Sequence, residues 1–199
     1  MGRTIKPYFC NRTYSFLWHH LPSKILEVFS RRIVMLPKGI LFLATLGPVG
    51  RKCPAPGTFG SLAGVLLVSI LFFTTNLSLL QIGLIFIPLI LLGVPLCTQA
   101  EIITGKSDPG EIIWDEFTSI PLVFIGLPNS ITRENTAEMI VWLLLGFGLF
   151  RIYDIFKPLG IKRIQHTGKG LGVMIDDVLA AFYSAITLHL IFTFSLSFF

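Results

Sequence analysis

Acidic side chains that could bind a metal ion gather in three separate stretches of this sequence. The first stretch ends in the run DPGEIIWDEF, residues 108–117. In a helix Glu111 and Asp115 would share one face, because they are four residues apart. Like-charged carboxylates placed in this way repel each other unless a cation or a proton neutralises them. Carboxylate oxygens are the ligands that Mg²⁺ prefers, so the run predicts a magnesium site that includes Asp115 and Glu116.

A second interpretation stays open for Asp108 in the same run. Pro109 suits the first turn of a helix, so Asp108 is equally well placed to cap that helix. The acids of the run could also simply face water beside Lys106. Asp115 and Glu116 fit that alternative poorly, because apolar residues flank the pair on both sides.

The second stretch, RIYDIFKP at 151–158, places two cations around one acid. Arg151, Asp154 and Lys157 recur every three residues, so they would occupy neighbouring positions on a helix end that Pro158 terminates. These side chains form either a structural ion pair or a phosphate clamp, in which Arg supplies a fork of donors and Lys a point charge. The spacing alone is compatible with both.

The third stretch, GKGLGVMIDD at 168–177, joins a glycine-rich segment to a pair of adjacent acids. Gly170 and Gly172 would let backbone N–H groups approach an anion closely. The segment does not have the spacing of a nucleotide-binding P-loop. Asp176 and Asp177 stand at the mouth of an apolar run, where two charges need a partner unless one of them caps the helix.

A fourth segment, APGTFGS at 55–61, precedes the first long apolar run. Free N–H groups at a helix N-terminus, together with the hydroxyls of Thr58 and Ser61, could bind a phosphate. The alternative is a helix start followed by small residues for close helix packing, and the segment alone favours this alternative.

Apolar segments long enough to cross a membrane separate these stretches. Of the 199 residues 53% are hydrophobic and 14% are charged, with a mean hydropathy of +0.76. An average soluble domain has about 25% charged residues, so there is too little charge here to cover a surface that faces water. A membrane helix needs about 20 mainly apolar residues. The sequence predicts five spans, near 59–75, 79–98, 112–128, 137–153 and 178–198.

The distribution of charge predicts the orientation of these spans. Fifteen of the 16 Lys and Arg residues fall on one side of the five-span arrangement, and Arg133 falls on the other. Cationic residues favour the cytoplasmic side, and the acids of the three stretches lie on that same side. The predicted fold is therefore an all-α, polytopic helical membrane protein with about five membrane-associated helices and an acidic site on the cytoplasmic side.

Two parts of the chain differ in composition. Residues 1–38 are predicted to form a basic, amphipathic N-terminal extension, with Met35 as an alternative start, and residues 39–199 the membrane domain. No basic stripe interleaved with aromatic residues lies on a polar element, so nucleic-acid binding is not expected. The three cysteines are widely spaced and offer neither a disulfide framework nor a CxxC metal pair.

Taken together, the four motifs resemble the phosphatidylglycerophosphatase A family. The matching segments are APGTFGSL at 55–62, DPGEIIWDEF at 108–117, FRIYDIFKP at 150–158 and GLGVMIDDVLAA at 170–181. The resemblance implies Mg²⁺-dependent hydrolysis of phosphatidylglycerol phosphate to phosphatidylglycerol and inorganic phosphate, in phospholipid biosynthesis at the bacterial cytoplasmic (inner) membrane. The expected partner is thus a phospholipid substrate within the membrane.

The resemblance also assigns roles to the motif residues. The implied metal ligands are Asp108, Asp115, Glu116, Asp154, Asp176 and Asp177. The candidate catalytic residues are Asp115, Glu116, Asp154 and Asp177. The candidate phosphate-binding residues are Arg151 and Lys157, which accompany the motif acids, and also Thr58, Gly170 and Gly172, which the helix start and the glycine-rich segment indicate on their own.

An alternative function is that of a membrane transporter or ion-coupled carrier, because ionisable residues inside a membrane also mark ion pathways. The sequence leaves open the oligomeric state, the number of metal ions, the acyl-chain preference and whether water or a carboxylate is the nucleophile. Against the carrier, the acids lie toward one edge of the predicted bundle, and no paired inverted repeat occurs in the chain.

Overall fold

Long apolar runs form the four main helices of this protein. They are α3 (Pro56–Thr74), α4 (Leu79–Thr104), α6 (Thr136–Phe156) and α8 (Lys169–Leu196). Each of the four is long and apolar enough to cross a membrane. Leu91, Leu144 and Phe194 are more than 60% exposed, which suits side chains that face lipid rather than water. The prediction of a polytopic helical membrane protein is confirmed.

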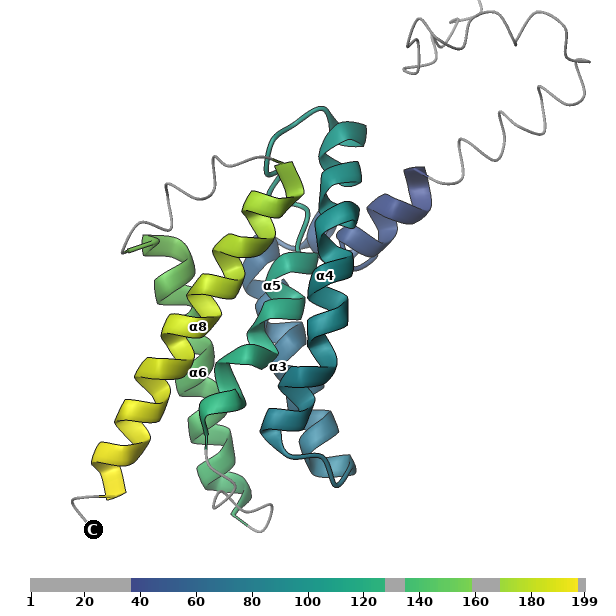
Figure 1. Ribbon diagram of the computed structural model, residues 1–199. Coiled ribbons are helices and arrows are strands. Elements are labelled where there is room, and N and C mark those ends of the chain that lie inside the picture. The colour runs from purple at the N-terminus through teal and green to yellow at the C-terminus, as the bar shows by residue number, and fades with distance from the viewer. Residues whose placement is uncertain (1–36, 128–134, 159–168, 197–199) are drawn as a thin grey trace, which may run out of the picture. The chain divides into compact units, whose positions relative to one another are not determined.

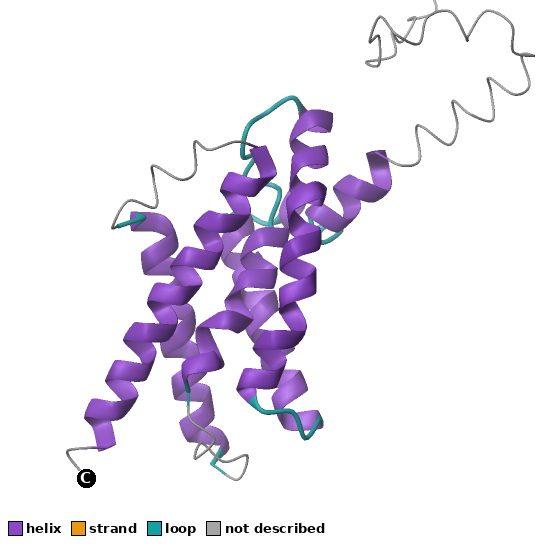
Figure 2. Ribbon diagram, in the orientation of Figure 1, coloured by secondary structure: helices purple, strands orange, loops and turns teal. Residues whose placement is uncertain are grey.

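The computed structural model describes residues 37–127, 135–158 and 169–196. Within these ranges the regular elements are helices and none is a strand (Figure 2). The chain divides into two units, residues 1–38 and residues 39–199. Apart from Pro37 and Lys38, the predicted N-terminal extension and the alternative start at Met35 lie outside the described residues.

Local sequence signals explain where several helices begin and end. The hydroxyl of Ser78 accepts a hydrogen bond from the backbone N–H of Gln81, whose side chain accepts one from the N–H of Ser78, so that a capping box starts α4. The helix ends at Thr104 and is capped by Gly105, in the left-handed conformation that glycine adopts without strain. Asn135 caps the start of α6, which ends at Phe156 and is followed by the C-terminal cap Lys157 and by Pro158.

The third predicted span, residues 112–128, is not a continuous membrane helix. The structure has a short helix α5 (Trp114–Ser119) followed by a 3₁₀ helix η2 (Ile120–Gly126), so this span is corrected to two short pieces. Both pieces are surrounded by protein, and Thr118, Ser119 and Val123 are fully buried. Irregular backbone at membrane depth is tolerated when protein encloses it. The predicted count of about five membrane-associated helices is therefore approximate.

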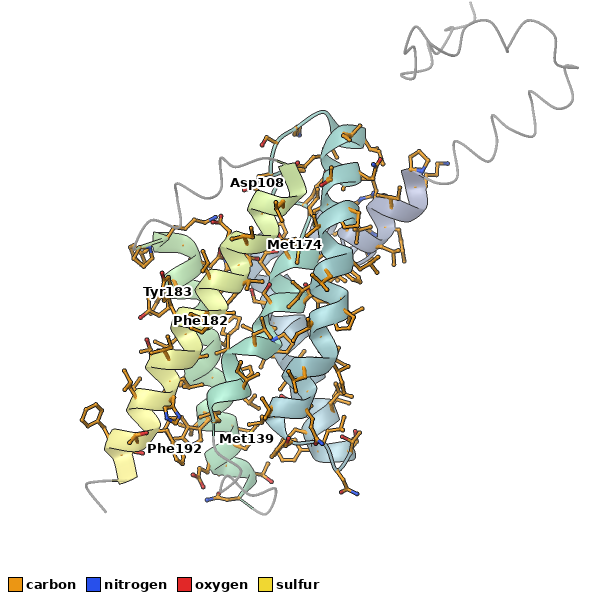
Figure 3. The ribbon with its side chains drawn as sticks, in the orientation of Figure 1. Asp108, Met139, Met174, Phe182, Tyr183 and Phe192 are labelled. Atoms are coloured by element: carbon orange, nitrogen blue, oxygen red, sulfur yellow. The ribbon has the colours of Figure 1, made fainter. Side chains whose placement is uncertain are left out.

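The long helices place the acidic stretches at one end of the bundle. A short turn joins the end of α3 to the start of α4, so these two helices run in opposite directions (Figure 1). Asp108 lies at the end of the bundle where α4 ends and α8 begins, whereas Met139 and Phe192 lie at the opposite end (Figure 3). The short helix α2 (Val49–Lys52) packs closely against the loop before α5. A Cβ added at Gly50 would lie only 2.1 Å from the carbonyl oxygen of Glu111.

Small residues let α3 and α5 approach closely, as the sequence predicted for the start of the first span. A Cβ added at Gly64 would lie 2.0 Å from Cγ2 of Ile120 and 2.8 Å from the carbonyl oxygen of Phe117. A Cβ added at Gly60 would lie 2.9 Å from Cβ of Ile113. These glycines therefore fix the distance between α3 and the α5–η2 segment, which carries part of the acidic site.

We expect Gly64→Ala to destabilise the folded protein by about 1–3 kcal/mol, because the added methyl group overlaps core atoms and a backbone oxygen. Thermal unfolding of the purified protein in detergent measures the change. Gly148→Ala in α6 is the matched control, since no atom lies within 4 Å of its added Cβ. Equal melting temperatures for the two variants would contradict this account of α3 packing.

Candidate active site

Three carboxylates from two helices meet at one point inside the bundle. Asp115 and Glu116 lie in the first turn of α5, and Asp177 lies near the start of α8. One oxygen of each side chain lies within 4.8 Å of the others, an arrangement that could hold a metal ion. Asp115 and Asp177 are each 4% exposed. Acids that are more than 60 residues apart in the sequence are thus neighbours in the fold.

These carboxylates carry oxygens that no described hydrogen-bond donor satisfies. Among the residues that the structure describes, Oδ1 of Asp115, Oε2 of Glu116 and Oδ2 of Asp177 are buried without a hydrogen-bond partner. Leaving a buried polar atom unpaired is costly, and an unpaired buried charge costs more. The group therefore requires protons or a cation to be stable in this position.

Burial and mutual repulsion change the proton affinity of the two acids in α5, which lies outside the four spans. Burial is the main cause that raises the pKa of Asp115 to about 6, and repulsion from Asp108 adds to it. Burial, followed by repulsion from Asp115 and Asp154, also raises the pKa of Glu116 well above its ordinary value. Without a cation, ionisation of one of these two side chains makes ionisation of the other less favourable.

Two ion pairs bring cations to the same end of the bundle. Nη1 of Arg151 lies 2.7 Å from Oδ2 of Asp154, one turn along α6. Nζ of Lys157 forms an ion pair with Oδ2 of Asp176 in α8. Lys157 has a backbone φ of +43°, in the left-handed region, which is uncommon for a residue other than Gly. The stretch thus contains an ion pair, that of Arg151 with Asp154, whereas Lys157 pairs with an acid of α8. Phosphate binding by the two cations stays a prediction.

The structure places the other predicted acids around the group of three carboxylates. Asp108 is exposed in the loop after α4, with a backbone φ of +47°. Its N–H donates a 2.8 Å hydrogen bond to Oε1 of Glu101, a buried residue in the last turn of α4. Asp154 and Asp176 hold the two cations. These three acids lie outside the group within 4.8 Å, although Asp108 and Asp154 still act on its charges.

The remaining predicted phosphate-binding residues lie in helices rather than in loops. Thr58 is half-buried in the first turn of α3. Gly170 and Gly172 belong to the first turn of α8, so the expected glycine-rich loop is helical at these positions. A Cβ at Gly170 would lie 2.3 Å from the backbone nitrogen of Thr98, which gives this glycine a packing role against α4. Phosphate binding by these three residues stays a prediction.

Two residues at the site, Glu101 and Gly57, were not among the predicted candidates, and Ser61 was named only as a hydroxyl that could bind a phosphate. Glu101 anchors the loop that carries Asp108, and Ser61 accepts a 3.3 Å hydrogen bond from Arg151. A Cβ at Gly57 would lie 2.2 Å from Oε1 of Glu116. The small residues of the APGTFGS segment were a visible signal, but their partners Glu116 and Arg151 lie far away in the sequence, whereas Glu101 is only seven residues from its partner Asp108.

We expect the metal-free protein to lose thermal stability as the pH rises from about 4 to about 6. The folded state binds more protons than the unfolded state in this range, because the pKa of Asp115 is raised on folding, and stability then falls with rising pH. Unfolding in detergent with EDTA measures the change. The decline should be smaller in Asp115→Asn, and an identical pH dependence in both proteins would contradict the assignment.

Comparison with known proteins gives consistent matches. Residues 42–192 match the family described as Phosphatidylglycerophosphatase A. Phosphatidylglycerophosphatase A of Haemophilus influenzae is 43% identical over 142 residues, which cover 69% of this chain and 79% of that protein. Phosphatidylglycerophosphatase A of Escherichia coli is 34% identical over 137 residues, which cover 68% and 73%.

A third relative has a different name. A protein of Bacteroides thetaiotaomicron, provisionally named a phosphatidylinositol-3-phosphatase, is 32% identical over 135 residues, which cover 66% of this chain and 80% of that protein. No solved structure matches the chain. The matched region 42–192 includes every acid and cation of the site described above.

Proposed function

Because this chain belongs to the phosphatidylglycerophosphatase A family, we propose that it hydrolyses phosphatidylglycerol phosphate to phosphatidylglycerol and inorganic phosphate. The family membership makes the chain an enzyme of the phosphatase class, which decides against the alternative of a carrier. The observation that carries the proposal is the group formed by Asp115, Glu116 and Asp177, with Arg151 and Lys157 near it.

The residues of this group fit a hard divalent cation such as Mg²⁺. Asp115, Glu116 and Asp177 supply only oxygen donors, and each has a buried oxygen without a described partner. Mg²⁺ is bound by a few carboxylates and keeps several waters or substrate oxygens. Asp108, Asp154 and Asp176 would join these ligands through side-chain movement or a second ion. A bound Mg²⁺ would offset charge on phosphate oxygens and lower the pKa of a water.

Arg151 and Lys157 are the candidate groups that bind the phosphomonoester. Arg151 is held by Asp154 and Ser61, and Lys157 by Asp176, so both cations are oriented before a substrate arrives. Oriented donors stabilise the charge that develops on phosphoryl oxygens in the transition state. Nε of Arg151 is buried without a described partner, so this donor would meet a phosphate oxygen only after a movement of the side chains that cover it.

The chemical step moves one proton at each end of the reaction. A carboxylate of the group would accept a proton from the attacking water, whose oxygen forms the new P–O bond. The bond between phosphorus and the glycerol oxygen breaks, and that oxygen takes up a proton from a protonated carboxyl group of the site or from solvent water, which gives the free hydroxyl group. An alternative route, in which an Asp attacks first and its phosphoester is then hydrolysed, uses the same residues.

The site end of the bundle is proposed to face the cytoplasm of a bacterial cell, at its inner membrane. Arg51 and Lys52 of α2 and Lys106 beside Asp108 are exposed, and the distribution of cations in the whole sequence favours the same side. A headgroup phosphate at the membrane surface would then reach Asp115 and Glu116 while the acyl chains stay beside the apolar faces of the spans.

Substitutions of the central acids test the proposal directly. We expect Asp115→Asn, Glu116→Gln, Asp154→Asn and Asp177→Asn each to lower kcat by about 100-fold or more, since each removes a charge from the reacting site. Phosphate release in detergent measures the rate. Glu138→Gln is the matched control, because Glu138 lies in the first turn of α6 at the opposite end. Near-normal rates in all four variants would end the assignment.

Metal and substrate dependence are tested in the same assay. We expect EDTA to abolish phosphate release and Mg²⁺ to restore it, because buried carboxylates alone repel a phosphate. The substrates to compare are phosphatidylglycerol phosphate, phosphatidic acid and phosphatidylinositol 3-phosphate, the last because of the name of the Bacteroides relative. Preference for either of the other lipids would replace the proposed substrate, and full activity in EDTA would remove the metal.

A further inference from the structure

We propose that Gly57 is a positioning residue of the active site, because the missing side chain leaves room for the Glu116 carboxylate and the Arg151 guanidinium against the first turn of α3. The proposal concerns how the acid and the cation are held, and its catalytic part rests on the function proposed above. Gly57 is the second residue of α3, directly after Pro56.

The distances leave no space for a side chain at this position. A Cβ built on Gly57 would lie 2.2 Å from Oε1 and 3.3 Å from Cδ of Glu116. The same Cβ would lie 3.5 Å from Nη1 of Arg151. An alanine here would therefore overlap the carboxylate and touch the guanidinium group. The backbone of α3 and two functional side chains, from α5 and α6, meet at this one glycine.

Gly50 and Gly64 are also closely packed, but they have a different kind of neighbour. A Cβ at Gly50 would meet a backbone oxygen, and one at Gly64 would meet core and backbone atoms of the α5–η2 segment. At Gly57 the nearest atom is the end of a flexible side chain. A methyl group at Gly57 is therefore accommodated by moving Glu116, which changes the geometry of the site and leaves the helix packing in place.

Ser61, one turn further along α3, connects the same helix to Arg151. Ser61 is fully buried, and its hydroxyl donates a 2.8 Å hydrogen bond to the carbonyl oxygen of Gly57. The same hydroxyl accepts a 3.3 Å hydrogen bond from Nη1 of Arg151. In the first two turns of α3, the Glu116 carboxylate thus packs against Gly57, and the Arg151 guanidinium group is hydrogen-bonded to Ser61. This contact fixes the two side chains relative to each other.

The position of Glu116 matters because it is one of the three carboxylates of the group that could hold a metal ion. Displacing its oxygens by about 1 Å would disturb both the metal ligands and the reacting geometry, and misplacement of this size costs up to about 100-fold in rate. The expected effect of Gly57→Ala is therefore on activity and metal affinity rather than on folding.

The test compares Gly57→Ala with Gly148→Ala in the full chain, purified in detergent. We expect Gly57→Ala to lower kcat by about 10- to 100-fold and to weaken Mn²⁺ binding, measured by electron paramagnetic resonance. The melting temperature should match that of Gly148→Ala, whose added methyl group contacts nothing within 4 Å. Unchanged kcat and Mn²⁺ affinity in Gly57→Ala would overturn the proposal, and so would a loss of folded protein.

A double-substitution cycle isolates the contact with Glu116. Asp is shorter than Glu by one methylene group, so Glu116→Asp would withdraw the carboxylate from the space at Gly57. We expect Gly57→Ala to weaken Mn²⁺ binding less in the Glu116→Asp protein than in the unmodified one. Equal effects in both backgrounds would show that Gly57 acts elsewhere.

The two proposals fail in different ways. If the unmodified chain releases no phosphate from any of the three lipids, the proposed function fails, and the Mn²⁺ affinities alone decide the role of Gly57. If the unmodified chain is active and Gly57→Ala equals Gly148→Ala in rate and Mn²⁺ affinity, the role of Gly57 fails and the proposed function stands.

Discussion

The burial of several like charges at one point is the constraint on which the rest of this structure depends. Asp115, Glu116 and Asp177 repel one another, and their buried oxygens have no donor among the described residues. Such a group is stable only when protons or a cation offset its negative charge. The pairing of Arg151 with Asp154 and of Lys157 with Asp176 keeps two cations close without neutralising the central carboxylates. The fold thus leaves the charge of these carboxylates to be offset by protons or by a cation.

The acidic group is built from two kinds of element, the long membrane helices and the short α5–η2 segment that they enclose. The four long helices present apolar side chains outward, and α3 contains no charged residue. The short helix α5 and η2 lie between them, where protein replaces lipid as the surroundings. Because glycines let α3 approach this segment closely, the N-terminus of α3 reaches Glu116 and, through Ser61, Arg151.

Local patterns in the sequence predicted much of this arrangement. Apolar runs predicted the four long helices, and the acids at their ends predicted a common site, because consecutive spans return the chain to the same side. The break within 112–128 was not predicted, since its apolar composition resembles that of a span and its enclosure by other helices is a tertiary property. The pairing of Lys157 with Asp176 and the contact of Gly57 with Glu116 were missed for the same reason. Periodicity gives the face of a residue but not its distant neighbour.

The α5–η2 segment has a consequence for how the protein enters the membrane. It is only 13 residues long from Trp114 to Gly126, it is not a regular helix throughout, and it carries two acids in its first turn. An acid in mid-membrane costs about 2.5–3.5 kcal/mol during insertion, so this segment is poorly suited to partition into lipid independently. Its neighbours α4 and α6 flank it in the chain, which favours their insertion together as one unit. Biogenesis of the site is then coupled to assembly of the bundle.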